Sequence, residues 1–271
     1  GARERGGLGG DTAWGEVDAG RDAATLGTKV RVGGKGPRVA GLVNHGFEAT
    51  IPLSRGRGYG EGLDAIRQGD MPNAQRPEPL VPRKLIRSIK ERIDSVGEVL
   101  VPVMYDDVRQ QVRELVDNGA EAIVVALTNA TENSAHEERV LEIILDEYPT
   151  HELGSIPVLL CSQVSGRKGE YVRATATIVD AFLHSTMFHA LNQLSSNLRD
   201  SGYEKPMLVI HNSGGMAQSN STDALQTIHS GPIAGVGAAQ HLSESTGLGD
   251  VVSMDMGGTS FDIGLVPAGG I

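Results

Sequence analysis

Two apolar runs flank a glycine-rich turn in the segment Val251-Val-Ser-Met-Asp-Met-Gly-Gly-Thr-Ser-Phe-Asp-Ile-Gly-Leu-Val266. Each run has the length and composition of a short strand, so the segment predicts a tight β-hairpin. Glycines let a backbone approach a bound oxyanion, and successive N–H groups in such a turn form an anion-binding nest. An ordinary turn with an aspartate at each end is the alternative. The full pattern, with Asp255 before the turn and Asp262 after it, favours a hairpin that binds phosphate.

Both aspartates of this hairpin are candidate catalytic residues. Asp255 and Asp262 are placed to hold a hydrated Mg²⁺ or to orient an attacking water, which is work that phosphoryl-transfer sites require. Asp255 is the candidate metal ligand. The turn itself supplies candidate phosphate donors through its backbone N–H groups and its hydroxyls. These turn residues are Gly257, Gly258, Thr259 and Ser260.

Two more glycine-rich segments point to the same kind of site. Asn212-Ser-Gly-Gly215 follows an apolar strand, and Ser230-Gly-Pro-Ile-Ala-Gly-Val-Gly237 precedes an alanine-rich helix. Open α/β sheets bind ligands at loops that follow strands, and a proline at a helix start leaves free N–H groups that favour an anion. Close helix packing explains the small residues about as well. Together with the hairpin, the two segments suggest one site, whose further candidates are Ser213, Gly214, Gly215, Ser230 and Gly231.

The rest of the chain alternates apolar strand patterns with amphipathic helix patterns. This alternation predicts an α/β fold in which the sheets are mostly parallel. Up to about residue 36 the sequence has no apolar period, and residues 54–82 read as a long irregular surface excursion. The predicted strands cover residues 38–43, 121–127, 156–161 and 206–211.

Local signals set the ends of the first two predicted helices. Asp106 or Asp107 can cap a helix that Gly119 ends. Ser134-Ala-His-Glu137 reads as a capping box that opens a second helix, and this helix closes before Pro149.

A third and much longer helix is predicted over residues 171–198. Glu170-Tyr-Val-Arg173 gives it a charged first turn with an aromatic anchor. His184 and His189 stand five residues apart on it, whereas two ligands on one helix face stand three or four apart. The pattern therefore does not favour a metal site on this helix.

Composition excludes several classes of protein. Lys and Arg number 24 against 34 Asp and Glu, and the resulting net charge of −10 argues against a nucleic-acid partner. Cys161 is the single cysteine, which excludes an intrachain disulfide and fits a reducing cytosol. No apolar run approaches the roughly 20 residues of a spanning helix. We therefore expect a cytoplasmic protein with neither a nucleic-acid nor a membrane partner.

Several motifs of the chain, taken in order, resemble the hydantoinase A family. This family includes ATP-dependent hydantoinases, 5-oxoprolinases and the large subunits of acetone and acetophenone carboxylases. The resemblance extends over most of the chain from about residue 27. The motifs that carry it are Gly41-Leu-Val-Asn-His-Gly-Phe47, Glu78-Pro-Leu-Val-Pro-Arg83, Glu91-Arg-Ile-Asp94 with Gly97-Glu-Val, Ala135-His-Glu137, Glu170-Tyr-Val-Arg-Ala-Thr175, Asn212-Ser-Gly-Gly215, Ser230-Gly-Pro232 and Asp255-Met-Gly-Gly-Thr-Ser260.

The resemblance implies the fold of the actin-like ATPases, whose two RNase H-like lobes have helices on both sheet faces and close on a nucleotide. The implied domains are an irregular segment over residues 1–36, a core over 37–249 and the start of a second lobe over 250–271. The family begins with a first phosphate hairpin, and no such string stands between Gly1 and Gly36. We therefore expect incomplete lobes, from either a fragment of a larger subunit or a separately encoded short one.

The resemblance also implies a function that uses ATP and Mg²⁺. It favours a subunit of a biotin-independent ketone carboxylase, which activates its substrate or bicarbonate by phosphorylation. The partners would be other subunits of a hetero-oligomer and a small carbonyl substrate. Ser54-Arg-Gly-Arg-Gly-Tyr-Gly60 and the excursion after it resemble the ketone carboxylases most. The alternatives are a hydantoinase or 5-oxoprolinase subunit that opens a cyclic amide, and a non-catalytic structural subunit.

Overall fold

The computed structural model describes residues 20–22, 36–54, 64–70, 79–257 and 261–268. The chain divides into two compact units, Pro37–Phe182 and the combination of Gly1–Gly36 with Leu183–Ile271. The division falls inside helix α7 (Glu170–Asp200), so its first turns belong to one unit and its remainder to the other. The predicted boundary after residue 36 coincides with a division between these units, whereas the one after residue 249 lies inside the second unit. The predicted domains stay a prediction.

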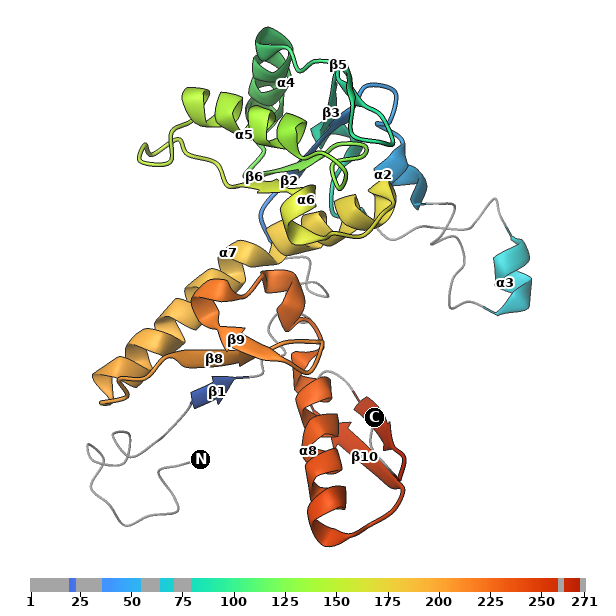
Figure 1. Cartoon of the computed structure of the whole chain (residues 1–271), viewed down its shortest axis with the longest axis vertical. Coiled ribbons are helices and arrows are strands. Elements are labelled where there is room, and N and C mark those ends of the chain that lie inside the picture. The colour runs from blue at the N-terminus through green and yellow to red at the C-terminus, as the bar shows by residue number, and fades with distance from the viewer. Residues whose placement is uncertain (1–19, 23–35, 55–63, 71–78, 258–260, 269–271) are drawn as a thin grey trace. The chain divides into compact units, whose positions relative to one another are not determined.

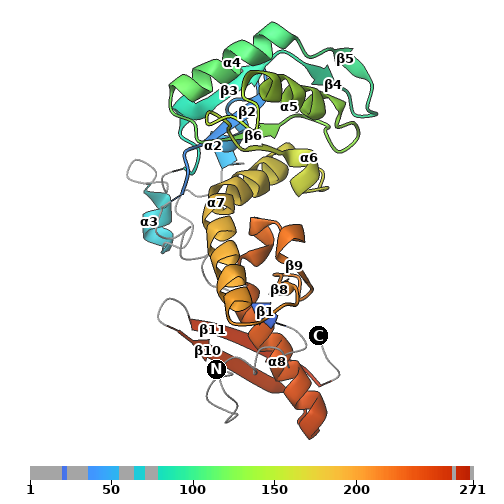
Figure 2. The ribbon, with the colours of Figure 1, turned by 90° about the vertical axis from the view of Figure 1, so that its left-hand side faces the viewer.

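A four-stranded parallel sheet forms the core of the Pro37–Phe182 unit, with strand order β3-β2-β6-β7. Every residue of β2 and β6 is buried, as expected for a parallel sheet that is covered on both faces. Helices α4 and α5 cover one face, and the first turns of α7 lie on the other (Figures 1 and 2). The strands predicted at 38–43, 121–127 and 156–161 are confirmed, whereas β3 was not predicted. The bounds are β2 Val39–Asn44, β3 Ile86–Ile89, α4 Tyr105–Asp117, β6 Ala122–Ala126, α5 Ala135–Glu147 and β7 Val158–Leu160.

The second unit holds a three-stranded sheet and a separate hairpin. In the sheet β1 and β8 are parallel, and β8 and β9 are antiparallel. Strand β8 is the strand predicted at 206–211, and the predicted hairpin is the antiparallel pair β10 and β11, against which α8 packs (Figure 2). The bounds are β1 Gly20–Asp22, β8 Met207–Ile210, β9 Met216–Gln218, α8 Ser230–Thr246, β10 Val251–Met256 and β11 Phe261–Val266.

Short elements connect these larger ones. The predicted excursion over 54–82 contains the short helix α3 (Ala65–Gly69), and its residues 55–63 and 71–78 lie outside the described residues. No helix in the described part of the chain is both long and apolar enough to cross a bilayer. The other short elements are α2 Thr50–Leu53, η4 Arg83–Leu85, β4 Arg92–Ile93, β5 Val99–Val101, α6 Cys161–Val164, η5 Ser219–Ser221 and η6 Ala224–Thr227.

The start of α4 differs from the prediction. Met104 is the N-cap residue, and no side chain caps the helix, so the predicted cap by Asp106 or Asp107 is wrong. The Asp107 carboxylate instead accepts a hydrogen bond of 2.8 Å from the backbone N–H of Lys90. The predicted end at Gly119 is confirmed, because its φ of +85° is the left-handed conformation that follows many helices.

The start of α5 differs as well. Ser134 is the N-cap residue, but its hydroxyl donates to the Glu138 carboxylate at 2.6 Å and caps no backbone N–H. Glu137, the other half of the predicted capping box, turns into the core and is 0 % exposed. The capping box is therefore wrong, because tertiary partners hold the Glu137 carboxylate.

The buried Glu137 carboxylate accepts four hydrogen bonds. The donors are the backbone N–H of Leu127 at 2.9 Å, the N–H and hydroxyl of Ser162 at 2.9 and 2.7 Å, and the thiol of Cys161 at 2.8 Å. Arg173, also buried, donates to the Leu127 carbonyl at 3.1 Å and to the Cys161 sulfur at 3.4 Å. Glu137 therefore ties the carboxyl ends of β6 and β7 to α5, and Arg173 fastens the start of α7 to the same point.

Replacing Glu137 by Gln should destabilise the Pro37–Phe182 unit by about 3 kcal/mol. The amide is neutral and presents a donor to groups that are themselves donors, so buried N–H and O–H groups lose their acceptor. Glu138→Gln is the matched control, because Glu138 is exposed and its carboxylate bonds to Ser134 alone among the described residues. It should change stability by less than about 0.5 kcal/mol. Denaturant unfolding of both variants measures the difference, and equal stability would refute the role of Glu137.

Cys161 should resist alkylation in the folded protein. Burial, aided by the neighbouring Glu137 carboxylate, raises the pKa of its thiol to about 12. The reactive thiolate is then about one molecule in 10⁴ at pH 8. Because the chain has one cysteine, iodoacetamide labelling followed by mass reports this site alone. Labelling should be at least about 100-fold slower in buffer than in denaturant, and comparable rates would show that the thiol is accessible.

Candidate functional site

The hairpin places its two aspartates directly opposite each other. Asp255 on β10 pairs with Asp262 on β11 in the antiparallel register. Like charges at such a position repel, and a cation between them relieves the repulsion. Gly257 is exposed beside the turn, whereas the predicted phosphate donors Gly258, Thr259 and Ser260 lie outside the described residues.

The same face of the hairpin is turned toward α8. A cavity of about 220 Å³ is lined by Pro232, Gly235 and Val236 on α8 and by both aspartates on the hairpin. The structure thus brings the carboxylate pair beside the first turns of this helix. The helix begins at Ser230, so the glycine-rich segment predicted to precede it is helical instead. Packing against the hairpin stabilises this helical form in spite of the glycines.

One glycine allows the hairpin to approach α8 closely. A Cβ at Gly264 would overlap the side chain of Val236 on α8 and the Ser253 hydroxyl on the neighbouring strand. Gly264 is buried and lines the cavity with the two aspartates. The shape of the cavity therefore depends on the absence of a side chain at this position.

The turn Asn212–Gly215 lies near the same helix start. Gly214 has a φ of +84°, and a Cβ added to it would lie 3.9 Å from Ile233 in the first turn of α8. Hydrogen bonds fix the turn, because Asn212 N–H donates to the Gln226 carbonyl at 2.7 Å. The predicted site residues of this turn, Ser213, Gly214 and Gly215, are exposed.

Two other predicted site residues open α8. Ser230 is 0 % exposed, and its hydroxyl has no hydrogen-bond partner among the described residues. His229 before it has a φ of +60°, which costs energy for a residue with a side chain. Gly231 follows and is half-buried. The site roles of Ser230 and Gly231 stay predictions. The strained backbone of His229 and the unpaired hydroxyl of Ser230 both lie at the helix end that favours anions.

The carboxylate pair fits Mg²⁺ better than it fits a transition metal. Within the described ranges no group of three or more His, Cys, Asp or Glu side chains could hold a metal ion. Mg²⁺ keeps several of its waters and is bound by one or two carboxylates together with substrate phosphates. Asp255 and Asp262 provide such a pair of hard oxygen ligands.

The sequence reasoning did not single out a second buried acidic residue. Glu91 and His136 are both buried, and the Nδ1 atom of His136 is hydrogen-bonded to the Glu91 carboxylate. Burial raises the pKa of Glu91, although its bond to His136 opposes this shift. Both residues stand in motifs that carry the family resemblance, and this was the sequence feature that could have pointed to the pair.

Comparison with known proteins agrees with this architecture. Residues 173–271 match the family model described as Hydantoinase/oxoprolinase, and residues 8–148 match the Hydantoinase/oxoprolinase N-terminal region. The acetophenone carboxylase gamma subunit of Aromatoleum aromaticum is 39 % identical over 232 residues, which are 86 % of this chain and 32 % of that protein. The chain thus spans about a third of the length of this relative.

Two solved structures are similar in fold. Nucleotide-free acetone carboxylase matches with a TM-score of 0.88 and 28 % identity, over 97 % of this chain and 37 % of that one. The ATP-dependent caprolactamase of Pseudomonas jessenii matches with a TM-score of 0.79 and 24 % identity, over 92 % of this chain and 35 % of that one. These likenesses confirm the predicted fold class, an α/β architecture of the actin-like ATPase type.

Replacing Gly264 by Ala should separate the hairpin from α8. The added methyl group has to displace Val236 or Ser253, which should cost about 1–3 kcal/mol. Gly237→Ala is the control, because nothing lies within 4 Å of a Cβ at that exposed helical position, and alanine favours a helix over glycine. Thermal melts should show a lower midpoint for Gly264→Ala alone. Equal midpoints would mean that the hairpin does not pack on α8 as described.

Proposed function

Because this chain belongs to the hydantoinase/oxoprolinase family, we propose that it forms part of an ATP-dependent, biotin-independent ketone carboxylase. The observation that carries the proposal is the pair Asp255 and Asp262, which face the first turns of α8 across one cavity. Likeness to an acetophenone carboxylase subunit and to acetone carboxylase supports a ketone substrate.

In this proposal the hairpin holds the phosphates of ATP. The backbone N–H groups of Gly257 and Gly258 and the hydroxyls of Thr259 and Ser260 donate to phosphate oxygens. Asp255 and Asp262 would hold Mg²⁺, and the bound ion would supply positive charge beside the transferred phosphoryl group. The first turn of α8, with Ser230 and Gly231, and the turn with Ser213, Gly214 and Gly215 complete the anion site.

Phosphorylation makes the subsequent carbon chemistry possible. Transfer of the γ-phosphoryl group from ATP, with release of ADP, would convert an enol oxygen into a phosphate ester or a carboxyl oxygen into a mixed anhydride. The first traps the enol, and the second gives the carboxyl carbon a good leaving group. Release of phosphate from the enol phosphate would leave an enolate, and its carbon would attack the carbon of the phosphorylated bicarbonate, from which a second phosphate leaves as the carbon–carbon bond forms. Other subunits of a hetero-oligomeric complex would complete the enzyme, and we place it in the cytoplasm, where the free thiol of Cys161 is stable.

A second candidate is an ATP-dependent amidohydrolase. The family description names hydantoinases and oxoprolinases, and the same activation by phosphate would open a cyclic amide with water. The two reactions differ in one requirement, because only the carboxylase consumes bicarbonate. A third candidate is a subunit that supports the complex without binding ATP.

Replacing Asp255 by Asn should lower ATP turnover by the assembled complex on the order of 10²-fold or more, which corresponds to roughly 3 kcal/mol of barrier. The substitution removes the charge and nearly preserves the shape, so thermal melts should change little. Glu244→Gln, at an exposed position of α8, is the control that should keep turnover near the wild-type rate. Turnover is measured with ATP, bicarbonate and acetone or acetophenone.

Two results of this assay would reject the proposal. Turnover of Asp255→Asn within about twofold of wild type would assign catalysis to another subunit and favour the structural alternative. With a hydantoin in place of the ketone, ATP-dependent ring opening without fixation of bicarbonate would favour the amidohydrolase.

A further inference from the structure

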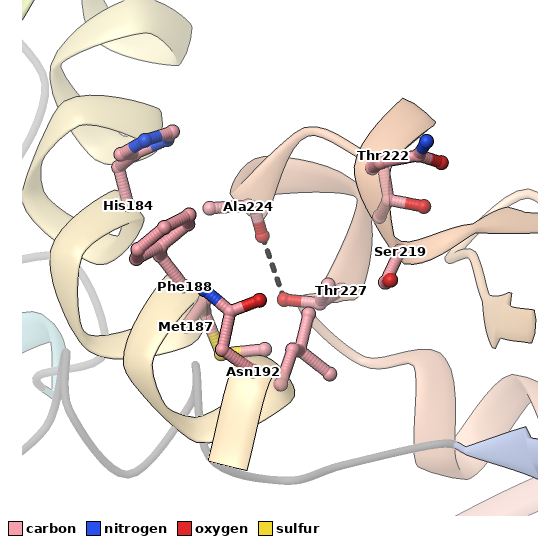
Figure 3. Close-up of a pocket in the computed structure, with 10 residues that line it drawn as sticks. His184, Met187, Phe188, Asn192, Ser219, Thr222, Ala224 and Thr227 are labelled. Carbon is pink, nitrogen blue, oxygen red and sulfur yellow. Dashed lines mark hydrogen bonds between the residues drawn. The ribbon is translucent and has the colours of Figure 1, made fainter. Parts of the chain in front are cut away.

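A second cavity, of about 340 Å³, lies in the Leu183–Ile271 unit between α7 and the segment that holds η5 and η6 (Figure 3). Its volume is within the usual range for small-molecule sites. Side chains from the two segments face each other across it. The lining residues are His184, Met187, Phe188, Leu191 and Asn192 on α7, and Ser219, Asn220, Thr222, Ala224 and Thr227 on the other side.

The floor and one wall of this cavity are apolar. Met187 is 2 % exposed and Ala224 is 5 % exposed, so both are fixed by packing. The ring of Phe188 remains 55 % exposed and stacks on the His184 ring, with centroids 6.3 Å apart. An exposed aromatic ring beside a buried apolar floor is a surface on which a flat apolar molecule can pack.

Apart from His184, the polar groups of the described residues that line the cavity are amides and hydroxyls. None of the described residues that line it is Asp, Glu, Lys or Arg. Two of the hydroxyls are already engaged, because Thr227 donates to the Ala224 carbonyl at 2.6 Å and Thr222 donates to the Gln218 carbonyl at 2.9 Å.

Other polar side chains at the cavity remain available to a ligand. Within the described part of the chain, the Asn192 amide and the Ser219 hydroxyl make no hydrogen bond, and both line the cavity. The Asn192 amide can donate to a carbonyl oxygen, and the hydroxyl can do the same. A ligand that offers an acceptor oxygen and no charge satisfies these groups without burying an unpaired ion.

We propose that this cavity binds a small neutral molecule with an apolar body and a carbonyl oxygen. The apolar body packs on Phe188 and Met187, and the oxygen accepts a hydrogen bond from Asn192. No lysine or arginine stands among the described residues of the lining, which disfavours a phosphate or carboxylate ligand. The inference rests on the proposed function, for which it identifies the place where the ketone is held, and it uses no residue of the Asp255 cavity.

Acetophenone is the probe for this site, and its binding is measured by calorimetry in the absence of ATP. Phe188→Ala and Asn192→Ala should each weaken binding by about tenfold, because one removes the stacking surface and the other removes the donor. Gln193→Ala is the matched control, since Gln193 is exposed on the same helix and does not line the cavity. Thermal melts of the variants verify that the exposed Phe188 can be removed without unfolding.

Three related compounds test the chemistry of the ligand. Ethylbenzene lacks the carbonyl, benzoate carries a charge, and adenosine is an aromatic part of ATP. The proposal predicts that each binds at least about tenfold more weakly than acetophenone. Acetophenone binding that is unchanged in both variants, or displacement of acetophenone by adenosine, would overturn it.

Asp255→Asn separates this inference from the proposed function. Acetophenone should bind that variant as it binds wild type, even where ATP turnover is lost. If Phe188→Ala loses ketone binding but hydrolyses ATP normally, the result would support ketone binding in the cavity without supporting the proposed function. Normal ketone binding with no effect of Asp255→Asn on turnover would reject the proposed function and leave the cavity standing.

Discussion

The buried carboxylate of Glu137 is the constraint on which the Pro37–Phe182 unit depends. A charge withdrawn from water is tolerated only when hydrogen bonds replace its hydration, and here four donors do so. These donors stand at the ends of β6 and β7, so they reach Glu137 only when the strands pair in register. Arg173 brings the start of α7 to the same point. The carboxyl ends of parallel strands usually form the ligand crevice of an open sheet. In this unit the Glu137 side chain lies at the carboxyl ends of β6 and β7, where a ligand would lie in such a crevice.

The candidate site in the other unit follows from a different constraint, which is the close approach of the hairpin to α8. The approach requires glycine at position 264, and it turns Asp255 and Asp262 toward a helix end that favours anions. The cavity beside Phe188 has a different chemistry, because its described lining holds apolar side chains, amides, hydroxyls and one histidine. An enzyme that phosphorylates a ketone needs both environments. One must stabilise the charges of the phosphates, and the other must hold an uncharged substrate.

Sequence patterns predicted the elements in which apolar residues determine the structure. The buried strands β2 and β6, the hairpin and the long helix α7 lie where periodicity placed them. The helix caps were wrong, because the carboxylates of Asp107 and Glu137 find tertiary partners that no local pattern reveals. The glycines of residues 230–237 suggested a turn before a helix, yet they form the first turns of α8, where the hairpin packs on them. The Phe188 cavity joins segments far apart in the chain, so spacing could not disclose it. The pairing of Asp255 with Asp262 was implied by the hairpin itself.

In the proposed function, Asp255 and Asp262 together hold a divalent cation with ATP. Manganese is a paramagnetic substitute for Mg²⁺ that accepts the same oxygen ligands. The direct measurement is electron paramagnetic resonance of Mn²⁺ added with ATP to the assembled complex. Wild type is compared with the double variant Asp255→Asn, Asp262→Asn. Per copy of this chain, wild type should bind one more Mn²⁺ than the double variant. The spectrum of the wild type should also show coupling to phosphorus, which indicates contact between Mn²⁺ and ATP. Equal Mn²⁺ binding by the two proteins would contradict it.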